Sequence, residues 1–106
     1  MEAFVEHRQH PRHHVTYACI FSPDGTHITE GLVEDLSLGG CRIKGAQPTR
    51  PGISMELQIR PENHTPVYVP YATVRWINAT TFGVEFISLP EIEASTLTRL
   101  LWPLSR

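Results

Sequence analysis

The segment Asp35-Leu36-Ser37-Leu38-Gly39-Gly40 is the part of the sequence from which a β fold is inferred most directly. Asp and Ser before Gly are turn residues whose side chains bond the adjacent backbone, and two successive glycines permit a sharp reversal. Alternating residues predict a strand over residues 27–35 before the segment and another over residues 41–44 after it. The segment therefore predicts two strands joined by a tight turn.

Apolar residues that alternate with polar ones predict four further strands on either side of this pair. Pro23-Asp24-Gly25 supplies a hairpin turn after the first strand. Pro70 lies inside the longest strand, where it cannot donate to a ladder and indicates a bulge or a sheet edge. The six predicted strands cover residues 15–21, 27–35, 41–44, 55–60, 67–77 and 81–86.

The last part of the sequence changes from strand to helix periodicity. Pro90 suits a first helical position, acidic residues follow it, and Arg99 lies towards the end. The helix is expected to stop at Pro103, and its apolar stripe would cover an open barrel mouth or pack on a sheet face. This stripe contains Leu97, Leu100, Leu101 and Leu104.

These elements predict a mainly all-β fold, a six-stranded antiparallel barrel with a C-terminal helix, because curling the sheet removes its exposed edges. A two-sheet sandwich is the alternative architecture. Residues 1–14 are polar and rich in histidine, and Pro11 interrupts any helix there, so we expect a flexible N-terminal arm. Residues 15–106 would form the barrel and helix, which gives one domain overall.

Composition limits the classes of partner. The 106 residues carry a formal charge of −2, which gives no general attraction for nucleic acid or an anionic membrane. The first residues lack the pattern of a secretion signal, and no run approaches the ~20 apolar residues that span a bilayer. We therefore expect a cytoplasmic protein without membrane insertion. Only one of the nine basic residues is Lys, which favours planar, two-pronged recognition of phosphates or base edges.

Cysteine and histidine side chains are the candidate metal ligands in this sequence. Cys19 and Cys41 lie in predicted strands without the close spacing of a zinc or redox pair, so we expect reduced, buried thiols. The four histidines of the arm could bind zinc adventitiously, but structural zinc sites usually include Cys from ordered turns. We expect no metal and solvated imidazoles, whose protonation below about pH 6.5 would add positive charge. These histidines are His7, His10, His13 and His14.

The arm also carries Arg8-Gln9-His10-Pro11-Arg12, with two arginines four residues apart. A guanine base presents O6 and N7 acceptors that match an Arg fork, and N1 and N2 donors that match the carboxylate of Asp35. Arg can also stack on a purine or pair with phosphate through two bonds. Either motif alone is commonly a solvated arm or an ordinary turn, whereas their combination indicates a guanine nucleotide.

Together these residues resemble the PilZ domain family, bacterial receptors for the second messenger cyclic di-GMP. The arginine pair matches the family's R-x-x-x-R motif, and Asp35-Leu36-Ser37-Leu38-Gly39-Gly40 matches its D/N-x-S-x-x-G motif. Gly83-Val84-Glu85-Phe86 is similar to the family's last barrel strand. The resemblance implies a six-stranded barrel with a C-terminal helix, in agreement with the strand count.

The resemblance also implies the residues that bind cyclic di-GMP. Arg8 and Arg12 would clasp guanine and phosphate groups, Asp35 and Ser37 would contact a guanine edge and nearby polar atoms, and Gly40 would let the ligand approach the backbone. Gly39 fills a variable position of its motif and ranks below these. Two more residues rank lower: His7, beside the first arginine, and Trp76, which could stack on guanine although its alternation with Val74 favours a core or rim position.

The expected function is a cyclic di-GMP receptor and adaptor that rearranges its arm on binding and regulates a partner protein in trans. It would use no cofactor. The alternative is a PilZ-like interaction module that acts without nucleotide. An oligonucleotide-binding barrel is disfavoured by the acidic charge and sparse aromatics. No catalytic motif indicates an enzyme. The sequence leaves open the partner, the affinity, the oligomeric state and whether one or two nucleotides bind.

Overall fold

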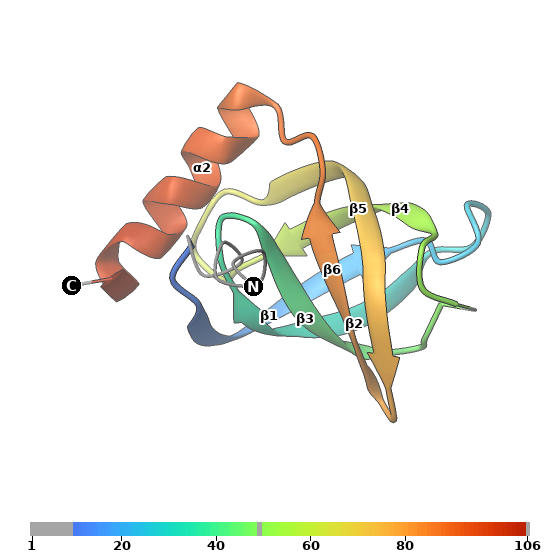
Figure 1. Ribbon diagram of the computed structural model, residues 1–106. Helices are drawn as coiled ribbons and strands as arrows, with labels where there is room; N and C mark the ends of the chain where they lie inside the picture. Colours follow the sequence, from blue (N-terminus) through green and yellow to red (C-terminus); the bar gives the residue numbers. More distant parts are fainter. Residues whose placement is uncertain (1–9, 49, 106) are drawn as a thin grey trace, which may run out of the picture.

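A computed structural model describes residues 10–48 and 50–105, and in these residues the chain forms one closed antiparallel barrel (Figure 1). The strand order around the barrel is β1-β2-β3-β6-β5-β4. The six strands are β1 (His13–Phe21), β2 (Thr29–Leu36), β3 (Gly40–Gly45), β4 (Ser54–Arg60), β5 (Val67–Asn78) and β6 (Thr81–Phe86). The predicted barrel is confirmed.

Closure depends on β1, which pairs with β2 on one side and with β4 on the other. Its pairing with β4 runs from Ala18 opposite Arg60 to Phe21 opposite Leu57. Because a single sheet closes on itself, the sandwich alternative is wrong. β1 begins at His13, two residues before the predicted start, because His13 and His14 pair with the end of β2.

Other strand boundaries shift by at most two residues from those predicted. β2 begins at Thr29 instead of residue 27, because His27 belongs to the preceding turn, where its backbone N–H donates to Asp24 Oδ1 over 2.8 Å. β3 extends from Gly40 to Gly45, because its ladder with β2 continues to Gly31. Turn side chains and pairing partners, which periodicity does not report, therefore set these ends.

The core fills the barrel and continues into the helix. Alternate strand residues point inward, and Phe82, Ile43, Leu57 and Ile59 are among its fully buried side chains. The helix α2 (Glu91–Leu101) adds Leu97, Leu100 and Leu101 to the same buried cluster. Figure 1 shows α2 across one end of the barrel, so the stripe covers the barrel mouth, as one of the two predicted placements requires.

The end of the helix differs from the prediction. α2 stops at Leu101, and a 3₁₀ turn, η1 (Trp102–Ser105), follows it. Pro103 therefore lies inside this tighter turn, where its missing N–H and fixed φ are tolerated, instead of marking the last helical residue. Leu104 leaves the buried stripe and is exposed, and Trp102 is 62% exposed.

The described strands contain four register shifts, one in β1, one in β2 and two in β5, and they determine which side chains face outward. In β2, Val33 pairs with Ile43 but Asp35 pairs with Arg42, so β2 has one extra residue. Val33 and Leu36 are both buried, which leaves Glu34 and Asp35 adjacent on the outer side. In β5, extra residues occur at residues 70–71, where Pro70 predicted a bulge, and at Arg75.

Both cysteines are free and buried, as predicted. Burial raises the pKa of the Cys19 thiol to about 12 and raises that of Cys41 well above its ordinary value. Both thiols are therefore neutral at physiological pH and act as small apolar core residues. In residues 10–48 and 50–105, no helix is both long and apolar enough to cross a membrane.

Candidate functional site

The turn between β2 and β3 satisfies its own polar groups. The backbone N–H of Ser37 donates to the Gly40 carbonyl oxygen over 2.9 Å, and the Ser37 hydroxyl accepts from the Gly39 N–H over 3.1 Å. Ser37 is 7% exposed. Its hydroxyl thus fixes the turn in this structure, which is the ordinary role of a serine before glycine.

The two glycines of the turn have different neighbours. A Cβ added to Gly40 would lie 2.3 Å from the backbone oxygen of Val84 on β6, so glycine permits close strand packing there. A Cβ on Gly39 would lie 2.8 Å from the His10 ring, the movable end of a side chain. Gly40 therefore has a structural requirement in addition to the ligand approach that the resemblance implies.

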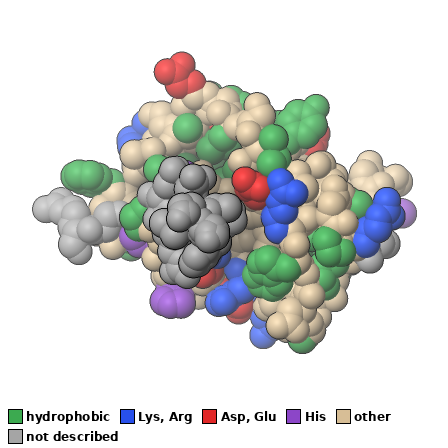
Figure 2. All heavy atoms as spheres, viewed as in Figure 1, with side chains coloured by type: hydrophobic (Ala, Val, Ile, Leu, Met, Phe, Trp, Pro, Cys, Tyr) green, Lys and Arg blue, Asp and Glu red, His purple; other side chains and the backbone are tan. Residues whose placement is uncertain are grey.

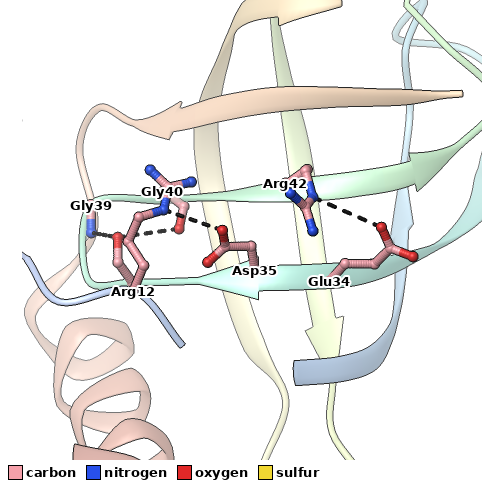
Figure 3. Close-up of polar contacts among 7 residues, drawn as sticks. Arg12, Glu34, Asp35, Gly39, Gly40 and Arg42 are labelled. Carbon is pink, nitrogen blue, oxygen red and sulfur yellow. Dashed lines mark hydrogen bonds and ion pairs between the residues drawn. The ribbon is translucent and has the colours of Figure 1, made fainter. Parts of the chain in front are cut away.

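Arg12 and Asp35 meet beside this turn (Figure 3). Arg12 Nε donates to Asp35 Oδ2 over 3.3 Å, which joins the segment before β1 to the outer side of β2. The Arg12 side chain is 58% exposed, whereas that of Asp35 is 14% exposed. Asp35 Oδ1 is buried and has no hydrogen-bond partner among the described residues. The sequence-predicted cation and carboxylate are therefore brought together, with one acceptor oxygen unused.

A second charge pair lies next to the first. Arg42 Nε is 3.8 Å from Glu34 Oε1, and Figure 3 shows these two residues on neighbouring strands beyond Asp35. The β2 bulge produces this arrangement, because it places Glu34 and Asp35 on the same side. Cations and carboxylates thus alternate along the outer surface of β2 and β3.

A hollow of about 600 Å³ opens beside Arg12. Its size lies in the range of small-molecule sites. It is lined by the β2–β3 turn with Ser37, Gly39 and Gly40, and by residues of β5 and β6. The residues that contribute polar or aromatic side chains to it include His10, Arg12, Ser37, Arg75, Trp76, Glu85 and Phe86.

Trp76 lies on the outer surface and lines this hollow. The extra residue at Arg75 reverses the alternation with Val74, so Trp76 is 40% exposed while Val74 is fully buried. A Cβ on Gly83 would lie 2.2 Å from the indole Nε1, which shows that the ring lies against the Gly83 backbone. The core position favoured by alternation is wrong, and the rim position holds.

Arg75 and Glu85 also line the hollow, although no motif in the sequence indicates them. Arg75 Nε donates to Glu85 Oε1 over 2.8 Å, and both side chains are about half exposed. Their position follows from the β5 bulge, which periodicity alone does not locate. Gly83, which pairs with Trp76 on β6, was the available signal in the sequence. An aromatic ring can lie against a neighbouring strand where that strand has no side chain.

Two predicted site residues, His7 and Arg8, lie outside the described residues. Of the histidine cluster, the structure describes His10, His13 and His14. Within the described ranges, no three His, Cys, Asp or Glu side chains come together as a metal site.

The site offers a cation, a carboxylate and an aromatic surface around one hollow. Where described residues form this face, Figure 2 shows acidic, basic and apolar side chains interspersed. Such an arrangement suits an anion that also presents a flat, hydrogen-bonding ring, because each group supplies one kind of contact. A nucleotide has these properties.

The barrel and its two motifs define a known family of domains. The sequence model of the PilZ domain family matches residues 6–101, and the chain belongs to this family. The match covers Arg8 and Arg12, the β2–β3 turn and all six strands of the described residues. No curated protein matches the chain in sequence.

Solved structures show the same fold at low sequence identity. The chain is similar to the Bacillus subtilis inhibitor of motility MotI/DgrA, with a TM-score of 0.78 and 20% identity over 92% of this chain and 51% of that one. It is also similar to Escherichia coli YcgR in complex with c-di-GMP, with a TM-score of 0.79 and 18% identity over 93% of this chain and 46% of that one. The chain thus spans about half the length of each.

A third similar structure is the PilZ domain of CeSA from a cellulose synthesizing bacterium. Its TM-score is 0.69 and its identity 20%, over 91% of this chain and 99% of that one. At these identities the likeness establishes the fold.

Proposed function

We propose that this PilZ protein is a cyclic di-GMP receptor that regulates a partner protein in trans. The observation that carries the proposal is the contact of Arg12 with Asp35 beside a hollow lined by Trp76 and the β2–β3 turn. These groups come from separate parts of the sequence, and each matches a different part of a guanine nucleotide. One structural relative, YcgR, has been crystallised with c-di-GMP.

In this proposal Asp35 reads the guanine edge. The unpaired Oδ1 is an acceptor without a donor, and a buried unpaired acceptor is unfavourable. When Arg12 turns from Asp35 toward phosphate, guanine N1–H and N2–H can donate to the carboxylate. Ser37 and Gly40 hold the backbone of the turn in place, and they support the ligand through that geometry.

Arg12 and Arg8 provide the positive charge in this proposal. Arg12 contacts Asp35 through Nε, and after it turns away its guanidinium can form a bidentate pair with phosphate. The movement of Arg12 would alter the segment before β1 and create a surface for a partner. The nucleotide supplies the signal, so the proposal includes neither a cofactor nor catalysis, and it places the protein in the cytoplasm.

Tryptophan fluorescence tests the binding site directly. The chain has two tryptophans, so Trp102→Phe leaves Trp76 as the reporter in the hollow, and Trp76→Phe leaves Trp102 in η1, after the end of α2. We expect cyclic di-GMP to change the emission of the Trp102→Phe protein saturably and to leave that of the Trp76→Phe protein unchanged. Equal responses, or none in either protein, would contradict the proposed location.

Regulation in trans is tested by affinity capture from a lysate of the source organism. Immobilised protein is compared with and without cyclic di-GMP, with an Arg12→Ala variant as the control for nucleotide dependence. We expect a protein retained only with nucleotide and only by the wild type. A partner retained equally in all conditions would instead support the module that acts without nucleotide.

A further inference from the structure

The outer face of β1 carries apolar residues where a half-buried strand should be polar. Cys19 and Phe21 point into the core and are buried, yet the outward residues between and before them are Ile20 and Ala18. On β2, Leu32 lies opposite Ala18 and is 40% exposed. A strand that is apolar on both sides is typical of one covered on both sides. We call Ala18, Ile20 and Leu32 the outer patch.

Two hollows adjoin the outer patch on either side of Ile20. The first has a volume of about 360 Å³, and Ala18 and Leu32 lie in its wall. The second has a volume of about 160 Å³, and it is lined by Ile28, which is 74% exposed, and by Tyr68, which is 37% exposed. The outer patch is therefore part of a larger, indented apolar surface that extends from β1 and β2 to Ile28, just before β2, and to Tyr68 on β5.

The charges around the outer patch are separated along the strand direction. Lys44 pairs with Leu32 and Arg60 pairs with Ala18. Both basic residues therefore lie in the row of paired residues that crosses the sheet through Ala18 and Leu32, which we call one level of the sheet. Glu30 lies beside Ile20, one level further along the outer face. Glu56 lies another level on, because its neighbour Leu57 pairs with Phe21. All four charged residues are exposed, with the acidic pair at one end and the basic pair at the other.

We propose that the outer patch binds a second copy of this chain. The two copies would be related by a two-fold axis that lies in the plane of the patch. This axis is perpendicular to β1 and passes between Ile20 and Ala18, so β1 runs in opposite directions in the two copies. The acidic end of each copy then covers the basic end of the other, as an isologous interface requires. Strands lie about 4.8 Å apart and packed faces about 10 Å apart, so long side chains such as Glu30 and Lys44 meet across it.

This association is independent of the proposed nucleotide site. The outer patch lies on β1 and β2, whereas the hollow beside Arg12 is lined mainly by β3, β5 and β6. In the strand order of the barrel, β6 is as far from β1 as a strand can be. In a dimer, the hollow beside Arg12 would therefore stay open in each copy. Loss of cyclic di-GMP binding would leave the dimer intact.

Paired charge-reversal variants give the decisive test. Glu30→Lys with Glu56→Lys makes the surroundings of the patch wholly basic, and Lys44→Glu with Arg60→Glu makes them wholly acidic. Analytical ultracentrifugation of wild-type protein is expected to show a concentration-dependent dimer. Each double variant alone should lose it through repulsion, and a mixture of the two should regain it as a mixed dimer.

The apolar contribution is tested separately. Leu32→Asp places a charge in the patch and is expected to abolish the dimer, whereas Ile92→Asp, at an exposed position on α2, is the matched control and should keep it. Circular dichroism establishes that each variant is folded. A wild-type protein that stays monomeric across the micromolar range, or a mixture of charge variants that stays monomeric, would overturn the proposal.

Discussion

Replacement of Arg12 by alanine separates a ligand-binding role from a structural one. The substitution removes a guanidinium that is 58% exposed and contacts Asp35 over 3.3 Å. The pair is exposed only on the Arg12 side, and its loss leaves the mostly buried Asp35 carboxylate without this donor, at a cost of roughly 1 kcal/mol. For a domain of this size, 1 kcal/mol corresponds to roughly 4–8 °C in Tm, so the ligand-free variant should melt within that interval of the wild type.

The expected loss of binding is larger. Charge-assisted hydrogen bonds to a phosphate or a guanine edge contribute roughly 1.5–3 kcal/mol each. A loss of about 2–3 kcal/mol raises Kd for cyclic di-GMP by roughly 30- to 150-fold. Isothermal titration calorimetry measures the change, and Arg99→Ala is the matched control, because Arg99 bonds Ser95 on the exposed helix surface. An unchanged Kd would refute the reasoning, and a collapse in Tm would make Arg12 a structural residue.

Three further substitutions test individual contacts. Asp35→Asn should reduce the preference for cyclic di-GMP over cyclic di-AMP by roughly tenfold or more, because the carboxylate is assigned to the guanine donors, and equal losses for both ligands in calorimetry would contradict that assignment. Glu85→Gln frees Arg75 and should tighten nucleotide binding by up to about 5-fold at low salt, and weaker binding would show that Glu85 contacts the ligand. Gly40→Ala should destabilise the fold by about 1–3 kcal/mol in thermal melts, and Gly39→Ala should cost less because the ring that it meets can move, so equal melting temperatures would contradict the packing argument.

Much of the architecture could be predicted because barrel strands and a covering helix leave periodic patterns. All six strands and the helix occur where alternation and capping residues indicate them. The pattern failed where the pairing gains a residue, as at Trp76, because a register shift depends on the partner strand. Pro70 was the exception, since proline itself cannot join a ladder.

The candidate site shows a similar division. The sequence identified Arg12 and Asp35 through their chemistry, and the structure brings them together across 23 positions of the chain. Arg75 and Glu85 were not selected, because only the β5 bulge and the pairing of β5 with β6 bring them to the hollow. Single charged residues on strands carry no sign of such a location.

The most direct measurement is a calorimetric titration of the folded wild-type protein with cyclic di-GMP, with cyclic di-AMP and GTP as comparison ligands. We predict saturable binding of cyclic di-GMP with a micromolar or lower Kd and much weaker binding of the other two. Absence of heat and of any change in Trp76 emission at high micromolar nucleotide would contradict the account.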